Sequence, residues 1–111
     1  MSTKQTTKQA TKQATKQAMK QTQTPFWVVG QSYFVRTVTH HLTGRLVGID
    51  EHEILLTDAA WIGDDGRFAQ AVAEGTFMEV EPYPDGRIVA VGRASLIDAV
   101  EVTFPLPRTQ S

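Results

Sequence analysis

Short runs of apolar and β-branched residues, separated by turn residues, fill most of residues 33–104. The pattern is clearest from Gly44 to Ala59, where two such runs flank the acidic sequence Asp-Glu-His-Glu. Runs this short favour strands over helices, and the acidic break supplies a turn. We therefore expect a tight, strongly bent antiparallel strand pair at the centre of the domain.

The flanking segments also predict strands. Residues Tyr33–Leu42 have apolar positions on both faces, which fits a strand inside a closed barrel or one covered by a neighbouring subunit. Residues 76–81 alternate, with Met78 and Val80 expected to point inward. Residues 87–91 and 94–104 are expected to form two further strands or one strand bent at Gly92, ended by Pro105 and Pro107.

One short helix is predicted at residues 67–74. Asp64 or Asp65 can cap its start, and Gly75 can end it. Two helical turns are not stable alone, so the helix must pack on the strands, and Trp61–Ile62 is the expected point of contact. Its apolar face consists of Phe68, Ala71 and Val72.

Residues 1–25 form a separate, basic arm of low complexity. Residues 3–22 repeat a four-residue unit of the Thr-Lys-Gln-Ala type five times, which is too polar to form a core. A solvated flexible tail, an ordered assembly arm and a nucleic-acid-binding arm all fit this composition. The arm contains every lysine of the chain: Lys4, Lys8, Lys12, Lys16 and Lys20.

The remaining residues, 26–111, are acidic. They contain six arginines and twelve Asp or Glu residues, a formal balance of 6 − 12 = −6. The arm could therefore bind nucleic acid, an anionic surface or the acidic face of a neighbouring copy. Only the last of these partners is supplied by the sequence itself.

The size of the domain also favours self-association, because so small a core leaves apolar surface to cover. The chain has no cysteine, no apolar run long enough to span a bilayer and no secretion signal. We expect a soluble cytoplasmic protein that does not bind membranes.

Three motifs resemble the Sm and Sm-like proteins. The Gly-x-Leu-x-x-x-Asp motif of that family is matched by Gly44, Leu46 and Asp50, and the following strand by Glu53–Ala59. Its Ile-Arg-Gly-x-x-Ile motif is approximated by Val91–Leu96. The resemblance implies that residues 26–111 form a five-stranded, strongly bent, SH3-like barrel with an insertion at 61–86. It also implies that edge strands of neighbouring copies pair into rings.

The RNA-contact positions of the family are not matched as well. Glu53 stands where the family has an asparagine, and the Arg-Gly pair is inverted to Gly92-Arg93. A ring of Glu53 carboxylates would repel phosphate, so the barrel lacks the counterion-release term that drives RNA binding. Arg93 could still supply one contact per subunit.

The sequence contains no pattern that predicts catalysis. His40 and His41 are adjacent on a strand or its turn, so their side chains tend toward opposite faces and do not readily share a metal ion. A structural pairing of either histidine with Asp50 or Asp58 is expected instead, and His52 is expected to be exposed. The carboxylates of residues 50–53 and 64–65 lack the spacing of a calcium site. We expect no metal, no cofactor and no enzymatic activity.

The sequence therefore predicts a non-catalytic module that forms a homo-oligomeric ring, with the arms mediating assembly. Lys8, Lys12, Lys16, Glu53 and Trp61 are the residues expected to act in assembly. The alternative is a nucleic-acid-binding protein that uses the five lysines together with Arg93. A small-ligand or enzyme site on the insertion around Trp61 is a third hypothesis, although no small-molecule substrate can be identified.

Overall fold

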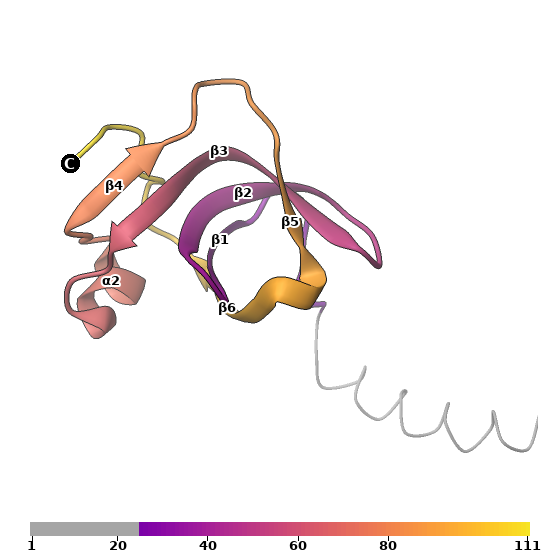
Figure 1. Cartoon of the computed structure of the whole chain (residues 1–111), viewed down its shortest axis with the longest axis horizontal. Helices are drawn as coiled ribbons and strands as arrows, with labels where there is room; N and C mark the ends of the chain where they lie inside the picture. The colour runs from indigo at the N-terminus through magenta and orange to yellow at the C-terminus, as the bar shows by residue number, and fades with distance from the viewer. Residues whose placement is uncertain (1–24) are drawn as a thin grey trace, which may run out of the picture.

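The computed structural model describes residues 25–111, so the five lysines of the arm lie outside the described residues. The predicted mainly β class is confirmed, but residues 25–111 contain six antiparallel strands in one sheet instead of the expected five, because the insertion at 61–86 adds β4. One α-helix and one 3-10 helix accompany the sheet within these residues. In chain order these are β1 (Ser32–Thr37), β2 (His41–Ile49), β3 (Glu53–Asp64), α2 (Phe68–Glu74), β4 (Glu79–Pro82), β5 (Val89–Gly92), η1 (Arg93–Ser95) and β6 (Leu96–Val102) (Figure 1).

Strand β3 organises the sheet because it pairs with three other strands. One of its edges pairs with β2, and the other pairs first with β5 and then with β4. Strand β1 follows on the far side of β2, and β6 pairs with β1. The sheet curves so that η1 alone connects β5 to β6 (Figure 1).

The predicted hairpin of β2 and β3 is confirmed, and Asp50 forms its turn. The Asp50 carboxylate accepts the backbone N–H groups of His52 at 2.7 Å and Glu53 at 2.9 Å. The Asp50 N–H in turn donates to the Glu53 carbonyl. The side chain thus satisfies backbone donors that the reversal of the chain leaves without a ladder partner.

Both hairpin strands bend at a defined place. Asp58 in β3 has φ of 51°, the left-handed conformation that is uncommon for a residue with a side chain. The β2–β3 register shifts at this point, between Thr43 and Arg45. On β2, a Cβ atom at Gly44 would lie 2.9 Å from the Leu56 Cβ, so only glycine fits at this position without a shift of Leu56. The bend therefore depends on both strands.

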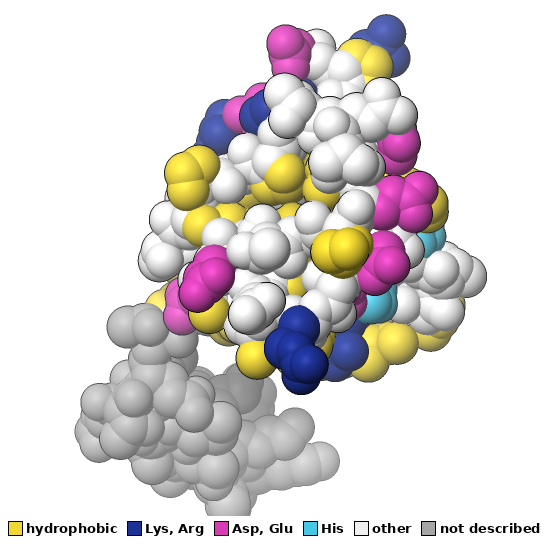
Figure 2. All heavy atoms as spheres, turned by 90° about the vertical axis from the view of Figure 1, so that its left-hand side faces the viewer, with side chains coloured by type: hydrophobic (Ala, Val, Ile, Leu, Met, Phe, Trp, Pro, Cys, Tyr) yellow, Lys and Arg dark blue, Asp and Glu magenta, His cyan; other side chains and the backbone are white. Residues whose placement is uncertain are grey.

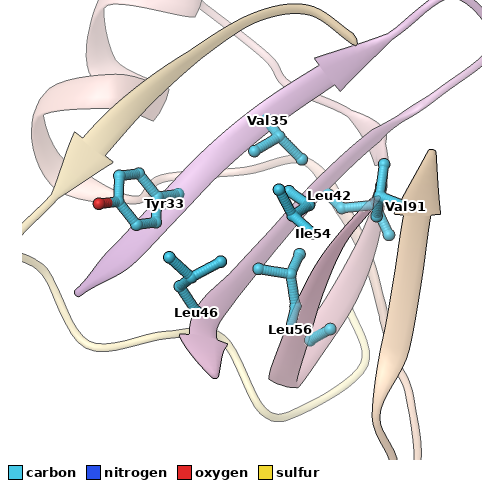
Figure 3. Close-up of a cluster of buried hydrophobic side chains, with 8 residues drawn as sticks. Tyr33, Val35, Leu42, Leu46, Ile54, Leu56 and Val91 are labelled. Carbon is cyan, nitrogen blue, oxygen red and sulfur yellow. The ribbon is translucent and has the colours of Figure 1, made fainter. Parts of the chain in front are cut away.

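The sheet is buried on both faces. The main core cluster lies on one face and comprises Tyr33, Val35, Leu42, Leu46, Ile54, Leu56, Ala59 and Val91 (Figure 3). The helix-side cluster comprises Phe34, Ala60, Ile62, Val80 and Val102, with Val72 of α2 and Phe104 of the C-terminal segment packed against it. Burial on both faces, predicted for the strand at Tyr33–Leu42, is confirmed for β1. The chain's own helix and C-terminal segment cover the second face.

The single strand predicted at Tyr33–Leu42 is wrong, because the chain reverses at residues 38–40. The Thr37 hydroxyl accepts the N–H groups of Thr39 and His40 and donates to the His40 carbonyl. One buried hydroxyl thus closes a turn that lacks Gly, Pro, Asn and Asp. For this reason the sequence showed no turn signal.

Two predictions around α2 are also wrong, although Gly75 ends the helix in the left-handed conformation as expected. No side chain caps its start: Asp64 accepts the Gly66 N–H instead. Met78 is 65% exposed, and Phe77 packs on the helix-side cluster in its place. The cause is that β4 begins only at Glu79, so the expected alternation does not extend to these residues.

We predict that Gly44→Ala lowers the free energy of unfolding by about 1–3 kcal/mol, because the added methyl group overlaps Leu56. Gly92→Ala is the matched control, since a Cβ there meets no atom within 4 Å and φ is already −66°. Urea unfolding of both variants measures the difference. Equal stability of the two would contradict the close approach at Gly44.

We predict opposite effects for two buried threonines. Thr43 is the ladder partner of Phe34 on β1 and of Ala60 on β3. Its buried hydroxyl has no hydrogen-bond partner within residues 25–111. Thr43→Val should therefore stabilise the fold by about 1 kcal/mol, whereas Thr37→Val should destabilise it by about 1–3 kcal/mol because it removes the turn hydroxyl. Thermal or urea unfolding measures both changes. If both variants changed the free energy of unfolding in the same direction, the different roles given to the two hydroxyls would be refuted.

Candidate functional site: the open strand edges

Two strands of the described residues have a free edge. Strand β5 pairs only with β3, and β6 pairs only with β1, so each has one edge without a ladder partner within residues 25–111. Free backbone donors and acceptors on an edge can pair with another chain, and proteins often block them with Lys or Pro. Neither β5 nor β6 contains either residue.

The edge of β4 is covered by the chain itself. The Ser111 N–H donates to the Val80 carbonyl at 3.1 Å, and the Val80 N–H donates to the Ser111 carbonyl at 3.2 Å. The Gln110 amide adds a hydrogen bond to the Glu81 carboxylate. On the side that carries α2 and this segment, apolar side chains show only between charged and polar ones (Figure 2). The C-terminal segment therefore occupies the edge of β4.

Arg108 holds this segment against the bend of β3. Its guanidinium donates to the Ala59 carbonyl and to the Tyr83 carbonyl, each at 3.0 Å. It also pairs with Asp85 at 2.7 Å. Ala59 follows the left-handed Asp58, so Arg108 satisfies carbonyl groups at the point where β3 changes partner.

The free edge of β5 lies beside the acidic turn. Glu53 and Gly92 are ladder partners, which brings Arg93 of η1 to the turn. The Arg93 N–H donates to the His52 carbonyl at 2.9 Å, and its guanidinium donates to the Asp50 carbonyl at 2.6 Å. The structure thus places Glu53 and Arg93 together, and Arg93 is engaged in holding the turn.

The electrostatics of the turn centre on Asp50. The backbone N–H groups of His52 and then Glu53 stabilise its ionised form and hold the pKa of the Asp50 carboxyl below its usual range. The nearby Arg93 acts in the same direction. Through its Oδ1 atom this carboxylate is therefore part of the turn.

One of the two acidic side chains on β6, that of Asp98, is neutralised by the neighbouring strand. Arg36 of β1 forms a bidentate ion pair with Asp98, which lowers the pKa of the Asp98 carboxyl. The Arg36 guanidinium also lies 4.9 Å from the centre of the Phe68 ring. Because Asp98 is paired within the chain, Glu101 is the one charge on β6 without an ion-pair partner among residues 25–111.

Trp61 lies apart from Glu53 and Arg93, at the other end of β3. It is half-buried and opposes Leu42 and Glu81 in the ladders. Ile62 belongs to the helix-side cluster, against which Val72 of α2 packs, while the Trp61 side chain points to the opposite face. Its role in assembly stays a prediction.

The expected pairing of His40 or His41 with Asp50 or Asp58 is wrong. His41 Nδ1 lies 3.0 Å from both carboxylate oxygens of Asp65, and Asp58 pairs with Arg45 at 2.8 Å. The positive φ of Asp58 and the turn at residues 38–40 change which side chains meet. A pattern of alternation cannot show either feature.

Within residues 25–111, no group of three or more His, Asp or Glu side chains converges on a possible metal site. The same residues contain no helix long and apolar enough to cross a bilayer. Comparisons of the chain with protein-family models, with curated proteins and with solved structures find no match.

Sequence reasoning missed the contribution of Arg108 and of the C-terminal segment. Pro105 and Pro107 correctly indicated the end of the last strand, since β6 ends at Val102. The residues that follow lack periodicity, and they find their partners only because the bend of β3 exposes carbonyl groups. A lone arginine in such a segment was the only available signal.

We predict that Asp50→Asn destabilises the protein at pH 7 and that this difference disappears as the pH falls. The folded-state pKa of Asp50 is depressed, so its stabilisation is present above the unfolded value of about 3.9 and is lost as the pH falls through the folded value. Urea midpoints at pH 7 and pH 3 measure the effect. Glu51→Gln is the control, as its side chain does not accept these N–H groups, and a pH-independent difference for Asp50→Asn would exclude the charge effect.

Proposed function

We propose that the protein is a non-catalytic assembly module, an Sm-like small barrel whose copies join edge to edge into a homo-oligomer. The supporting observation is the contrast between the edges: the C-terminal segment occupies β4, while β5 and β6 are free and carry neither Lys nor Pro. Pairing of β5 in one copy with β6 in the next would complete the backbone hydrogen bonds of both strands.

This contact joins two different surfaces of the same chain. Such a head-to-tail interface forms a closed ring if the rotation between copies closes, and a filament if it does not. The curvature of the sheet supports a ring, because successive copies would each continue the turn.

The lysine-rich arm contributes electrostatic attraction between copies. Residues 26–111 carry a formal charge of −6, and within residues 25–111 Glu53, Glu74, Glu79 and Glu101 have no ion-pair partner. Arms of neighbouring copies would offer cations to these carboxylates. Exposed pairs of this kind contribute little each, so the arm adds to the strand pairing and does not replace it.

The nucleic-acid alternative depends on the same five lysines. The described residues do not favour it, because the Arg93 guanidinium is bound to the Asp50 carbonyl of the turn and lies near the Asp50 carboxylate. If the alternative holds, affinity for single-stranded RNA falls steeply with salt and disappears when residues 2–24 are deleted. Assembly in the absence of nucleic acid distinguishes the two functions.

We predict that the purified chain is oligomeric at micromolar concentration and that Ala90→Lys makes it monomeric. Ala90 is exposed on β5, and a lysine there adds the charge that protects natural edge strands. Ala73→Lys adds the same charge on α2, away from the edge, and should leave the oligomer intact. Native mass spectrometry or light scattering reports the mass, and electron microscopy with and without residues 2–24 reports the form. A monomeric wild-type chain would rule out the proposal.

A further inference from the structure

A cavity of about 170 Å³ lies beside the free edge of β5. Its lining includes Leu42 and Val91, which belong to the main core cluster, together with Val89 of the edge strand. The turn between β1 and β2 forms the opposite wall. A cavity of about 150 Å³ can hold a benzene molecule, so this one can accept a branched aliphatic side chain.

The polar groups around the cavity are already hydrogen-bonded. The Thr37 hydroxyl donates to the His40 carbonyl, the Ser95 hydroxyl donates to the Gly92 carbonyl, and Thr39 Oγ1 lies 2.8 Å from His40 Nδ1. These groups therefore need no polar ligand to satisfy them. The aliphatic side chains of Leu42, Val89 and Val91 offer contacts to an apolar occupant.

The free edge of β6 presents such a side chain. The β1–β6 ladder pairs Arg36 with Asp98 and Thr37 with Leu96, so Ile97 is the extra residue of a bulge. A bulge redirects the side chain of the inserted residue, and Ile97 is 61% exposed. Leu96 and Ala99, on either side of the bulge, pack against the main core cluster, so Ile97 interrupts the alternation of β6.

Charge complementarity selects one register between β5 and β6 of a second copy. If the strands are antiparallel, like every ladder of this sheet, placing Ile97 beside Val91 also places Glu101 beside Arg87. Neither Arg87 nor Glu101 has an ion-pair partner within residues 25–111. A shift by two residues either way keeps the same faces together but separates these charges.

We propose that Ile97 of one copy inserts into the cavity beside β5 of the next copy, and that Arg87 and Glu101 fix the register of the two strands. This inference rests on the proposed edge-to-edge assembly and specifies its contacts. The occupant of the cavity is thus a second copy of this chain.

The first test compares two substitutions of exposed apolar residues. Ile97→Asp should raise the dissociation constant of assembly at least about tenfold, because a carboxylate would lose its water beside Leu42, Val89 and Val91. Met78→Asp introduces the same charge at a site that is also exposed, 65% against 61%, but lies before β4. Its assembly should match that of the wild type. Circular dichroism verifies that both variants fold.

The second test is a charge-reversal cycle. Arg87→Glu and Glu101→Arg should each weaken assembly about threefold to fivefold, and the double variant should recover most of the loss. Sedimentation velocity over a concentration series measures the three constants. Recovery in the double variant, together with the loss in Ile97→Asp, supports the inference.

The failure of this inference is distinct from the failure of the proposed function. If the wild type assembles but Ile97→Asp behaves like Met78→Asp, or if the double reversal does not recover, the cavity and register are overturned while edge pairing stands. If the wild-type chain is monomeric, edge pairing and the present inference both fail.

Discussion

The structure depends on the bend of β3 at Asp58. A strand that continued straight could pair with one neighbour on each edge, whereas the bend lets β3 pair with β5 before it and with β4 after it. The bend combines a residue in the left-handed conformation with the small Gly44 on the adjacent strand. Next to it, the Ala59 carbonyl accepts the Tyr83 N–H and the Arg108 guanidinium, which also donates to the Tyr83 carbonyl. A side chain from the far end of the chain thus connects the bend to the residue that follows β4.

The same bend separates a protected part of the sheet from an unprotected one. After the bend, β4 lies under the C-terminal segment and its edge is hydrogen-bonded to Ser111. Before the bend, the sheet curves from β5 through β3, β2 and β1 to β6, and the two outer strands are linked only by η1. Backbone groups that cannot pair within the chain can pair with another copy. The proposed assembly follows from this difference in how the edges are treated.

Charge has different roles in the two parts of the chain. In the described residues, several arginines are engaged locally: Arg36 with Asp98, Arg45 with Asp58, and Arg108 with Asp85. These pairs hold strands and turns together and leave an excess of carboxylates. The lysines are confined to the arm, so cations that can reach another copy come mainly from there. Strand pairing would set the geometry of an assembly, and the arms would add attraction that salt weakens.

The sequence by itself determined the features that rest on neighbouring residues. These are the mainly β class, the hairpin around Asp50, the short helix ended by Gly75 and the end of the last strand before Pro105, because each is encoded by local periodicity or by one turn residue. It did not determine the turn at Thr37, the outward position of Met78, the partners of His41 or the binding of Arg108. Those features depend on which backbone groups the bent sheet exposes. The open edges and the cavity beside β5 likewise exist only after folding, because they arise where β5 and β6 do not pair with each other.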